Sequence, residues 1–223
     1  VAVGAAVGAA ATGLGILTKQ AVSAYSAYEQ LTGGVDTLFK TAYDQVMQYA
    51  NNAYKTAGLS ANAYMDTVTS FSASLIASLD GDTAEAAEKA NGAITDMADN
   101  ANKMGTAMEP IQNAYQGFAK QNYTMLDNLK LGYGGTKEEM ERLLADAEKI
   151  TGIHYDISSF ADITDAIHVI QTELDITGTT AKEAATTVEG SINMTKASWE
   201  NLVTGLGDSN SDIERLVSEF TTS

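Results

Sequence analysis

The sequence predicts an all-α fold of about eight amphipathic helices joined by short, glycine-containing turns. After Gly34, apolar residues recur three and four positions apart along almost the whole chain, which is the spacing of one buried helix face. Glycines and the single proline, Pro110, fall between these apolar runs, where helices end and begin. No segment alternates apolar and polar residues like a half-buried strand. With 44% hydrophobic residues, we expect a compact helical domain preceded by an apolar segment.

The leading segment, residues 1–27, is treated separately because no charged residue precedes Lys19. It is rich in glycine and alanine, and its GxxxG spacing allows helix backbones to approach closely in lipid. A membrane span needs about 20 apolar residues, whereas the low leucine and phenylalanine content equally fits a small-residue helix packed within a multimer. The residues expected to carry either role are Gly4, Val7, Gly8, Ile16 and Leu17.

Residues 28–223 are expected to form the helical domain. Its first apolar stripe covers residues 35–53, and Ser60 is placed to cap the second helix. After a turn at residues 80–82, a third helix carries small and flexible apolar residues in strict three-four alternation. These residues are Ala87, Ala90, Ile94, Met97, Ala101, Met104 and Met108. Their heptad spacing suits close helix packing, either in the core of one chain or in a seam between copies.

The second half of the chain predicts a long helix over residues 110–129 that stops at a glycine hinge. The hinge residues are Gly132, Gly134 and Gly135, which supply backbone conformations that other residues adopt reluctantly. Thr136 and Glu139 have the spacing of a capping box for the next helix. A further stripe covers residues 160–174.

A second capping box, Thr180 with Glu183, precedes a long helix toward Leu206. The last helix carries its apolar residues over positions 213–220.

Composition excludes several classes of function. The formal net charge of −16 disfavours binding to phosphate backbones, so we expect no specific nucleic-acid binding. The absence of cysteine removes thiol catalysis and zinc–thiolate sites. His154 and His168 are the only histidines, and neither lies in a zinc-peptidase motif. We therefore predict that the chain is not an enzyme, with no catalytic residue and no cofactor.

One acidic segment nearly matches a calcium-binding loop. Asp208, Asn210, Asp212 and Glu219 have the ligand spacing of an EF-hand loop. The glycine that gives this loop its sharp turn is replaced by Ile213, which also belongs to an apolar helical stripe. A helix start rich in capping acids is the simpler interpretation, so no metal is predicted.

Several long strings of the sequence resemble the conserved region of tail tape-measure proteins from phages and prophages of Gram-positive bacteria. The resemblance lies in Gly58–Ala90, Asn113–Lys149, Tyr155–Ala184 and Ser198–Asp208, which occur in the same order as in that family. It extends from about Tyr28 to the end of the chain. The glycine-broken helices indicate a compact domain attached to the ruler rather than a length of the ruler itself.

The resemblance implies a structural virion component that sets tail length during assembly and is released to assist passage of the genome through the host envelope. The implied partners are further copies of the chain, three by resemblance, together with tail-tube and tail-tip or baseplate proteins. Contact with the host membrane is possible through the lead. The implied location is the tail lumen or tip, and the host envelope during infection. The alternatives are a secreted helical pore-forming toxin and a tail-associated cell-wall hydrolase.

Overall fold

The computed structural model describes residues 2–186 and 188–223, and the side chains of residues 19–184 and 190–223. Within these ranges the chain is all-α and contains no strand, so the predicted fold class is confirmed. The helices are α1 (Ala2–Phe39), η1 (Lys40–Ala42), α2 (Tyr43–Thr56), α3 (Ala61–Ser78), α4 (Thr83–Met104), α5 (Met108–Phe118), η2 (Leu126–Leu129), α6 (Lys137–Thr151), α7 (Phe160–Glu173), α8 (Thr179–Thr186), α9 (Val188–Gly205) and α10 (Ile213–Thr222). Here η denotes a 3-10 helix.

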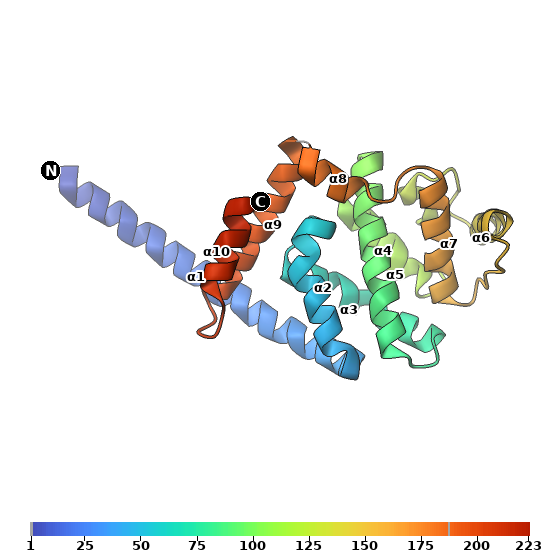
Figure 1. Ribbon diagram of the computed structural model, residues 1–223, viewed down its shortest axis with the longest axis horizontal. Coiled ribbons are helices and arrows are strands. Elements are labelled where there is room, and N and C mark those ends of the chain that lie inside the picture. Colours follow the sequence, from blue (N-terminus) through green and yellow to red (C-terminus); the bar gives the residue numbers. More distant parts are fainter. Residues whose placement is uncertain (1, 187) are drawn as a thin grey trace.

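Helix α1 is the longest element, with 38 residues and a length of about 57 Å at 1.5 Å per residue. Its N-terminal part extends beyond the other helices at one end of the molecule, and α6 and α7 lie at the opposite end (Figure 1). The helix runs without a break across residues 27 and 28 and through Gly33 and Gly34. Two adjacent glycines can end a helix, but here α1 continues through them, because α3 packs against this part of α1. A Cβ atom on Gly34 would already lie 3.6 Å from Thr69 of α3.

The hydrophobic core lies where α2, α3 and α4 meet and continues to α5, α6 and α7. The predicted three-four repeat, which covers α4 and ends at Met108, the first residue of α5, is part of this core. Ala87, Ala90, Ile94 and Met97 are fully buried, and Ala101, Met104 and Met108 are partly buried against the same cluster. These residues therefore form an intramolecular core, and their surface is already occupied within one chain.

The predicted helix over residues 110–129 is wrong. Helix α5 begins at Met108 and ends at Phe118, where the backbone N–H of Asn122 donates to the carbonyl of Gly117 at 2.9 Å. A Cβ atom on Gly117 would lie 2.9 Å from the carbonyl oxygen of Asn122, so only glycine allows this close turn. The apolar residues were predicted to lie on one helix because their spacing is helical. In the structure they belong to two elements, α5 and η2, which bury them in the same core.

Helix caps largely agree with the sequence. The side chains of Ser60, Thr136 and Asp212 accept bonds from backbone N–H groups at the starts of α3, α6 and α10. The predicted long helix from Thr180 toward Leu206 is instead α8 and α9, and the capping acceptor at the start of α8 comes from α4. That contact belongs to the polar cluster described next.

Candidate functional site: the polar seam of helix α4

A set of polar side chains, partly buried and partly at the edge of the interior, follows one side of α4. We call it the α4 polar seam and define it as Lys89, Asp96, Asp99 and Asn100 of α4 with Asp165, His168 and Gln171 of α7. Asp96, Asp99, Asn100 and Gln171 are buried, although the other buried residues of α4 are all apolar. A buried polar side chain is costly unless it is bonded, so each contact of this seam needs an explanation.

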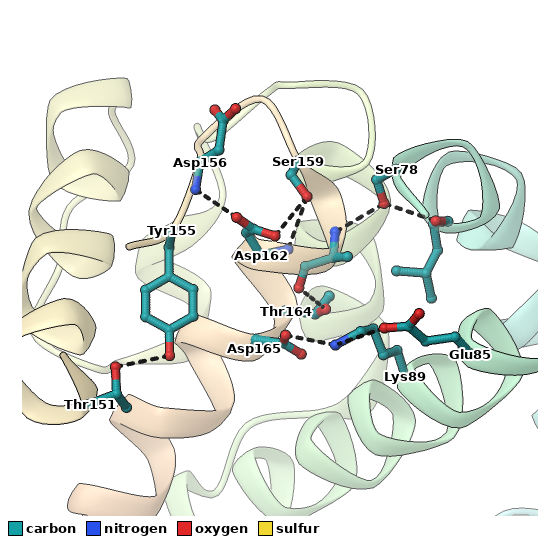
Figure 2. A network of polar contacts seen from close by, with 12 residues as sticks. Ser78, Glu85, Lys89, Thr151, Tyr155, Asp156, Ser159, Asp162, Thr164 and Asp165 are labelled. Carbon is teal, nitrogen blue, oxygen red and sulfur yellow. Dashed lines mark hydrogen bonds and ion pairs between the residues drawn. The ribbon is translucent and has the colours of Figure 1, made fainter. Parts of the chain in front are cut away.

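At the N-terminal end of the seam, α4 and α7 are joined by an ion pair. The Nζ atom of Lys89 lies 2.7 Å from Oδ2 of Asp165, and Glu85 approaches the same ammonium at 4.0 Å (Figure 2). Lys89 is mostly covered, with 22% of its side chain exposed, so water screens this pair less than a fully exposed one. The pair joins α7 to α4 at this end of the seam.

The start of α7 is held from two directions. Ser159 caps the helix by accepting from the N–H of Asp162, and its hydroxyl donates to the carboxylate of Asp162 (Figure 2). The backbone N–H of Ala161 donates to the hydroxyl of Ser78, at the end of α3, at 3.2 Å. One hydroxyl thus satisfies an N–H that the helix itself cannot pair, and it ties α7 to α3.

In the middle of the seam, His168 of α7 contacts Asp96 of α4. The Nδ1 atom of His168 lies 2.9 Å and 3.0 Å from the two carboxylate oxygens of Asp96. The hydrogen bond to Asp96 raises the pKa of His168 above its ordinary value. Burial raises the pKa of Asp96 more than the contact with His168 lowers it. The imidazole is 52% exposed whereas the carboxylate is 4% exposed, so the pair lies at the edge of the interior.

At the C-terminal end of the seam, Asp99 acts as the capping residue of a different helix. Its carboxylate accepts from the backbone N–H groups of Gly178, at 2.6 Å, and Thr180, at 2.8 Å. These groups lie at the start of α8, where a negative charge is also favoured by the helix dipole. The next residue, Asn100, donates its side-chain amide to the carbonyl of Leu129 in η2 at 2.9 Å. Helix α4 therefore holds three other elements through successive polar side chains.

Among the described side chains, Asp96 is the hydrogen-bond partner of His168. A histidine paired with a carboxylate can act as a base, but it needs a nucleophile within hydrogen-bond reach. The hydroxyl of Thr164, one turn before His168, donates to the carbonyl of Ala161 in its own helix. Burial raises the pKa of the nearby Tyr115 well above its ordinary value, which disfavours the phenolate, its nucleophilic form. What the arrangement does is lock α7, α8 and η2 onto α4.

The glycine hinge predicted from the sequence is a turn that hydrogen bonds and close backbone packing hold in place. Of the three glycines, only Gly132 has a positive φ, at 87°. The N–H of Gly134 donates to the carboxylate of Glu139 at 2.9 Å. Gly135 lies against the backbone of Thr124, where a Cβ atom would overlap the carbonyl oxygen. The expectation that positive φ explains Gly135 is wrong; a close backbone approach explains it.

Arg142 of α6 adds a clamp to this turn. Its guanidinium donates to the carbonyl of Gly132 at 2.7 Å and lies 4.2 Å from the ring centre of Tyr133. It also pairs with Glu139 at 2.6 Å. The three contacts hold the turn from both sides.

The near-match to a calcium loop is used for capping. Asp208 accepts from the N–H of Asn210 and from the hydroxyl of Ser211. Asp212 caps α10, and Glu219 pairs with Arg215 at 2.6 Å on the helix. Among the described residues no group of three or more histidine, cysteine, aspartate or glutamate side chains is placed to hold a metal ion.

The side chains of the lead residues Gly4, Val7, Gly8, Ile16 and Leu17 lie outside the described residues. In the part of the chain that was searched for membrane spans, none of the helices combines the length and apolar character that a crossing requires.

Comparison of the chain with protein-family models, with curated protein sequences and with solved structures gives no match. The fold and the seam define a helical domain in which polar side chains join segments that are far apart in the sequence. Sequence reasoning missed this seam because its partners are far apart: Asp96 and His168 are separated by 72 residues, and Asp99 and Thr180 by 81. The only available signal was the placement of two acids within the apolar repeat of α4.

Proposed function

We propose that this chain is a structural part of a phage tail or phage-tail-like particle, as a domain of a tape-measure protein. In this role it takes part in setting tail length during assembly and leaves the tail to assist passage of the genome through the host envelope. The sequence strings from Gly58 to Asp208 that resemble this family support the assignment. The chain acts through its shape and its contacts, and not by catalysis.

The single structural observation that carries the proposal is the form of α1. A continuous helix of 38 residues extends from a compact helical body (Figure 1). A helix rises only about 1.5 Å per residue but resists bending, so a rod joined to a body suits a protein that lies along a narrow tube. The polar seam fits the same role, because its contacts between distant helices keep the body in one arrangement.

The net negative charge of the chain suits a protein that lies in the path of DNA without binding it. The net charge of −16 repels the phosphate backbone, so a genome passing through the tail would not adhere to this domain. The lead up to Thr18 carries no charge, and it is the part suited to contact with a membrane or with other copies.

The test is made in the virus or prophage that encodes the chain. Tails are purified, the chain is quantified by mass spectrometry against the tube protein, and tail lengths are measured by electron microscopy. We expect a few copies per tail, and tails that are absent or irregular in length when a stop codon replaces the codon for Tyr28. A synonymous change at the same codon is the control.

Normal tails in the stop-codon mutant would exclude the proposal. Clearing of a cell-wall gel by the purified chain would instead favour a wall hydrolase. Release of dye from vesicles by a chain that is absent from particles would favour a pore-forming toxin.

A further inference from the structure

An apolar surface on α9 and α10 remains exposed. Ile192, Trp199 and Leu206 are 60%, 39% and 46% exposed, and they are spaced seven residues apart. Phe220 of α10 lies beside this row, with its ring centre 5.3 Å from that of Trp199. Val217, one turn earlier on α10, is 42% exposed. We call this set the α9 stripe. Exposed apolar residues at seven-residue spacing are the pattern of a helix that packs against another helix.

Helix α1 carries a matching seam. In its C-terminal half, Ala21, Ala24, Tyr28, Leu31, Val35 and Leu38 alternate at three and four residues, and all are buried or partly buried against the body. The sequence continues this alternation through Val3, Val7, Ala10, Leu14 and Leu17. Because α1 is one continuous helix, these positions lie on the same side of the helix axis. The drift of a straight helix is about 20° per heptad, or about 50° between Ala21 and Val3, so the two parts of the seam stay within the same half of the helix surface.

Helix α1 packs against its own α9 and the turn after it, where a Cβ atom on Gly207 would lie 2.6 Å from the carbonyl oxygen of Ala21, and the N-terminal half of α1 then leads away from the body (Figure 1). The geometry points to a second copy of this chain as the partner: we infer that the lead of one copy packs along the α9 stripe of its neighbour. The two surfaces have similar length, since Val3 to Leu17 and Ile192 to Leu206 are each 14 positions apart, or about 21 Å at the rise of a helix. Leu206 directly follows the end of α9 at Gly205, and its backbone N–H still donates to the carbonyl of Leu202 at 3.0 Å.

Charge supports the same pairing. Copies of this chain repel one another through their net charge of −16, but the lead carries no charge up to Thr18. The approach of an uncharged helix to an apolar stripe avoids most of this repulsion. Burial of both apolar surfaces is favourable because each is removed from water.

The competing arrangement, a bundle formed only by the leads, is disfavoured by the position of the body. The seam of α1 faces the body along residues 21–38. In a parallel bundle the seams face a common axis, so each body would lie on that axis and would collide with the others. A lead placed on a neighbouring body has no such conflict. Repetition of this head-to-tail contact closes a ring when the rotation allows it.

This inference specifies the self-association that the proposed function includes. It is tested on the purified full chain, whereas the proposed function is tested in tails, so the two can fail separately. The chain contains no cysteine, which gives a clean background for cross-linking. Ala10→Cys places one thiol on the seam of the lead. Lys196→Cys places one on the exposed side of α9, one turn from both Ile192 and Trp199.

We expect a disulfide between chains when the Ala10→Cys and Lys196→Cys proteins are mixed and mildly oxidised, and little in either protein alone. Ile153→Cys, at a 59% exposed position after α6, replaces Lys196→Cys in the control mixture and should give little product. Efficient cross-linking of Ala10→Cys by itself would establish a bundle of leads and overturn the inference.

Sedimentation equilibrium gives the second measurement. Ile192→Glu puts a charge into the stripe and should raise the dissociation constant about tenfold or more. Ile153→Glu is a matched change, since the two isoleucines are 60% and 59% exposed, and it should leave association unchanged. Circular dichroism confirms that both variants fold. A wild-type chain that is monomeric at every concentration, or equal association of the two variants, would refute the inference.

Discussion

The turn before α6 offers a sharp test of the packing argument, because its three glycines are explained by different causes. A Cβ atom on Gly135 would overlap the carbonyl oxygen of Thr124 and lie 2.9 Å from the carbonyl carbon. These are backbone atoms, so relief of the overlap requires movement of the chain around Thr124. That segment precedes the buried Leu126, and its movement would disturb the core.

We expect Gly135→Ala to lower the free energy of unfolding by about 2–3 kcal/mol, in the range found for overpacked sites. For a chain of this length, that corresponds to a fall in the melting temperature of roughly 4–12 °C. The assay is urea denaturation followed by circular dichroism, with thermal melting as a second measurement. The helical signal should be unchanged in the absence of urea.

Two neighbouring glycines serve as controls. A Cβ atom on Gly134 would meet Glu139 at 3.5 Å, an ordinary contact, so Gly134→Ala should change stability by less than about 0.5 kcal/mol. Gly132 has open space around it but a φ of 87°, so Gly132→Ala should cost about 1–2 kcal/mol through backbone strain alone. If Gly135→Ala were as stable as Gly134→Ala, the close approach to Thr124 would not constrain this turn.

The other predictions concern the polar seam and the acidic loop. The raised pKa of His168 means that its protonated form favours folding; this contribution is complete below the ordinary pKa near 6.5 and is lost as the pH rises through the raised value. His168→Ala should therefore lower the free energy of unfolding by about 1 kcal/mol near pH 6 and by clearly less near pH 9; the value is modest because the imidazole is half exposed. If the loss measured by urea denaturation were the same at both pH values, the ion pair with Asp96 would be contradicted. Asp99→Ala removes the hydrogen-bond acceptor at the start of α8 and should lower the free energy of unfolding by about 1–2 kcal/mol. Amide hydrogens of residues 178–186 should then exchange faster than those of α7, and equal protection of both segments would show that the cap is dispensable. Calcium at millimolar concentration should leave the melting temperature equal to that in a chelator, and an upward shift would reveal a site at Asp208–Glu219.

The contacts of the candidate site could not be predicted from the sequence. The sequence alone indicated the fold class, the core residues of α4 and the caps at Ser60 and Thr136, but not the pairing of Asp96 with His168. The polar partners of α4 belong to α7, α8 and η2, and nothing in local spacing relates them. His168 by itself shows no motif, because its role depends on a carboxylate 72 residues earlier in the chain.

The sequence by itself determined where α3 and α6 begin, because an N-cap acts over three residues: Ser60 accepts from Ala63, and Thr136 from Glu139. It also determined the all-α class, because apolar periodicity is a local property. The tertiary structure decided where α1 and α5 end. Packing of α3 against α1 keeps the helix continuous through Gly33 and Gly34, whereas a close backbone contact at Gly117 ends α5 despite a continuing apolar stripe. Contacts between distant segments contribute free energies comparable to local helix preferences, so they decide the outcome wherever those preferences are weak.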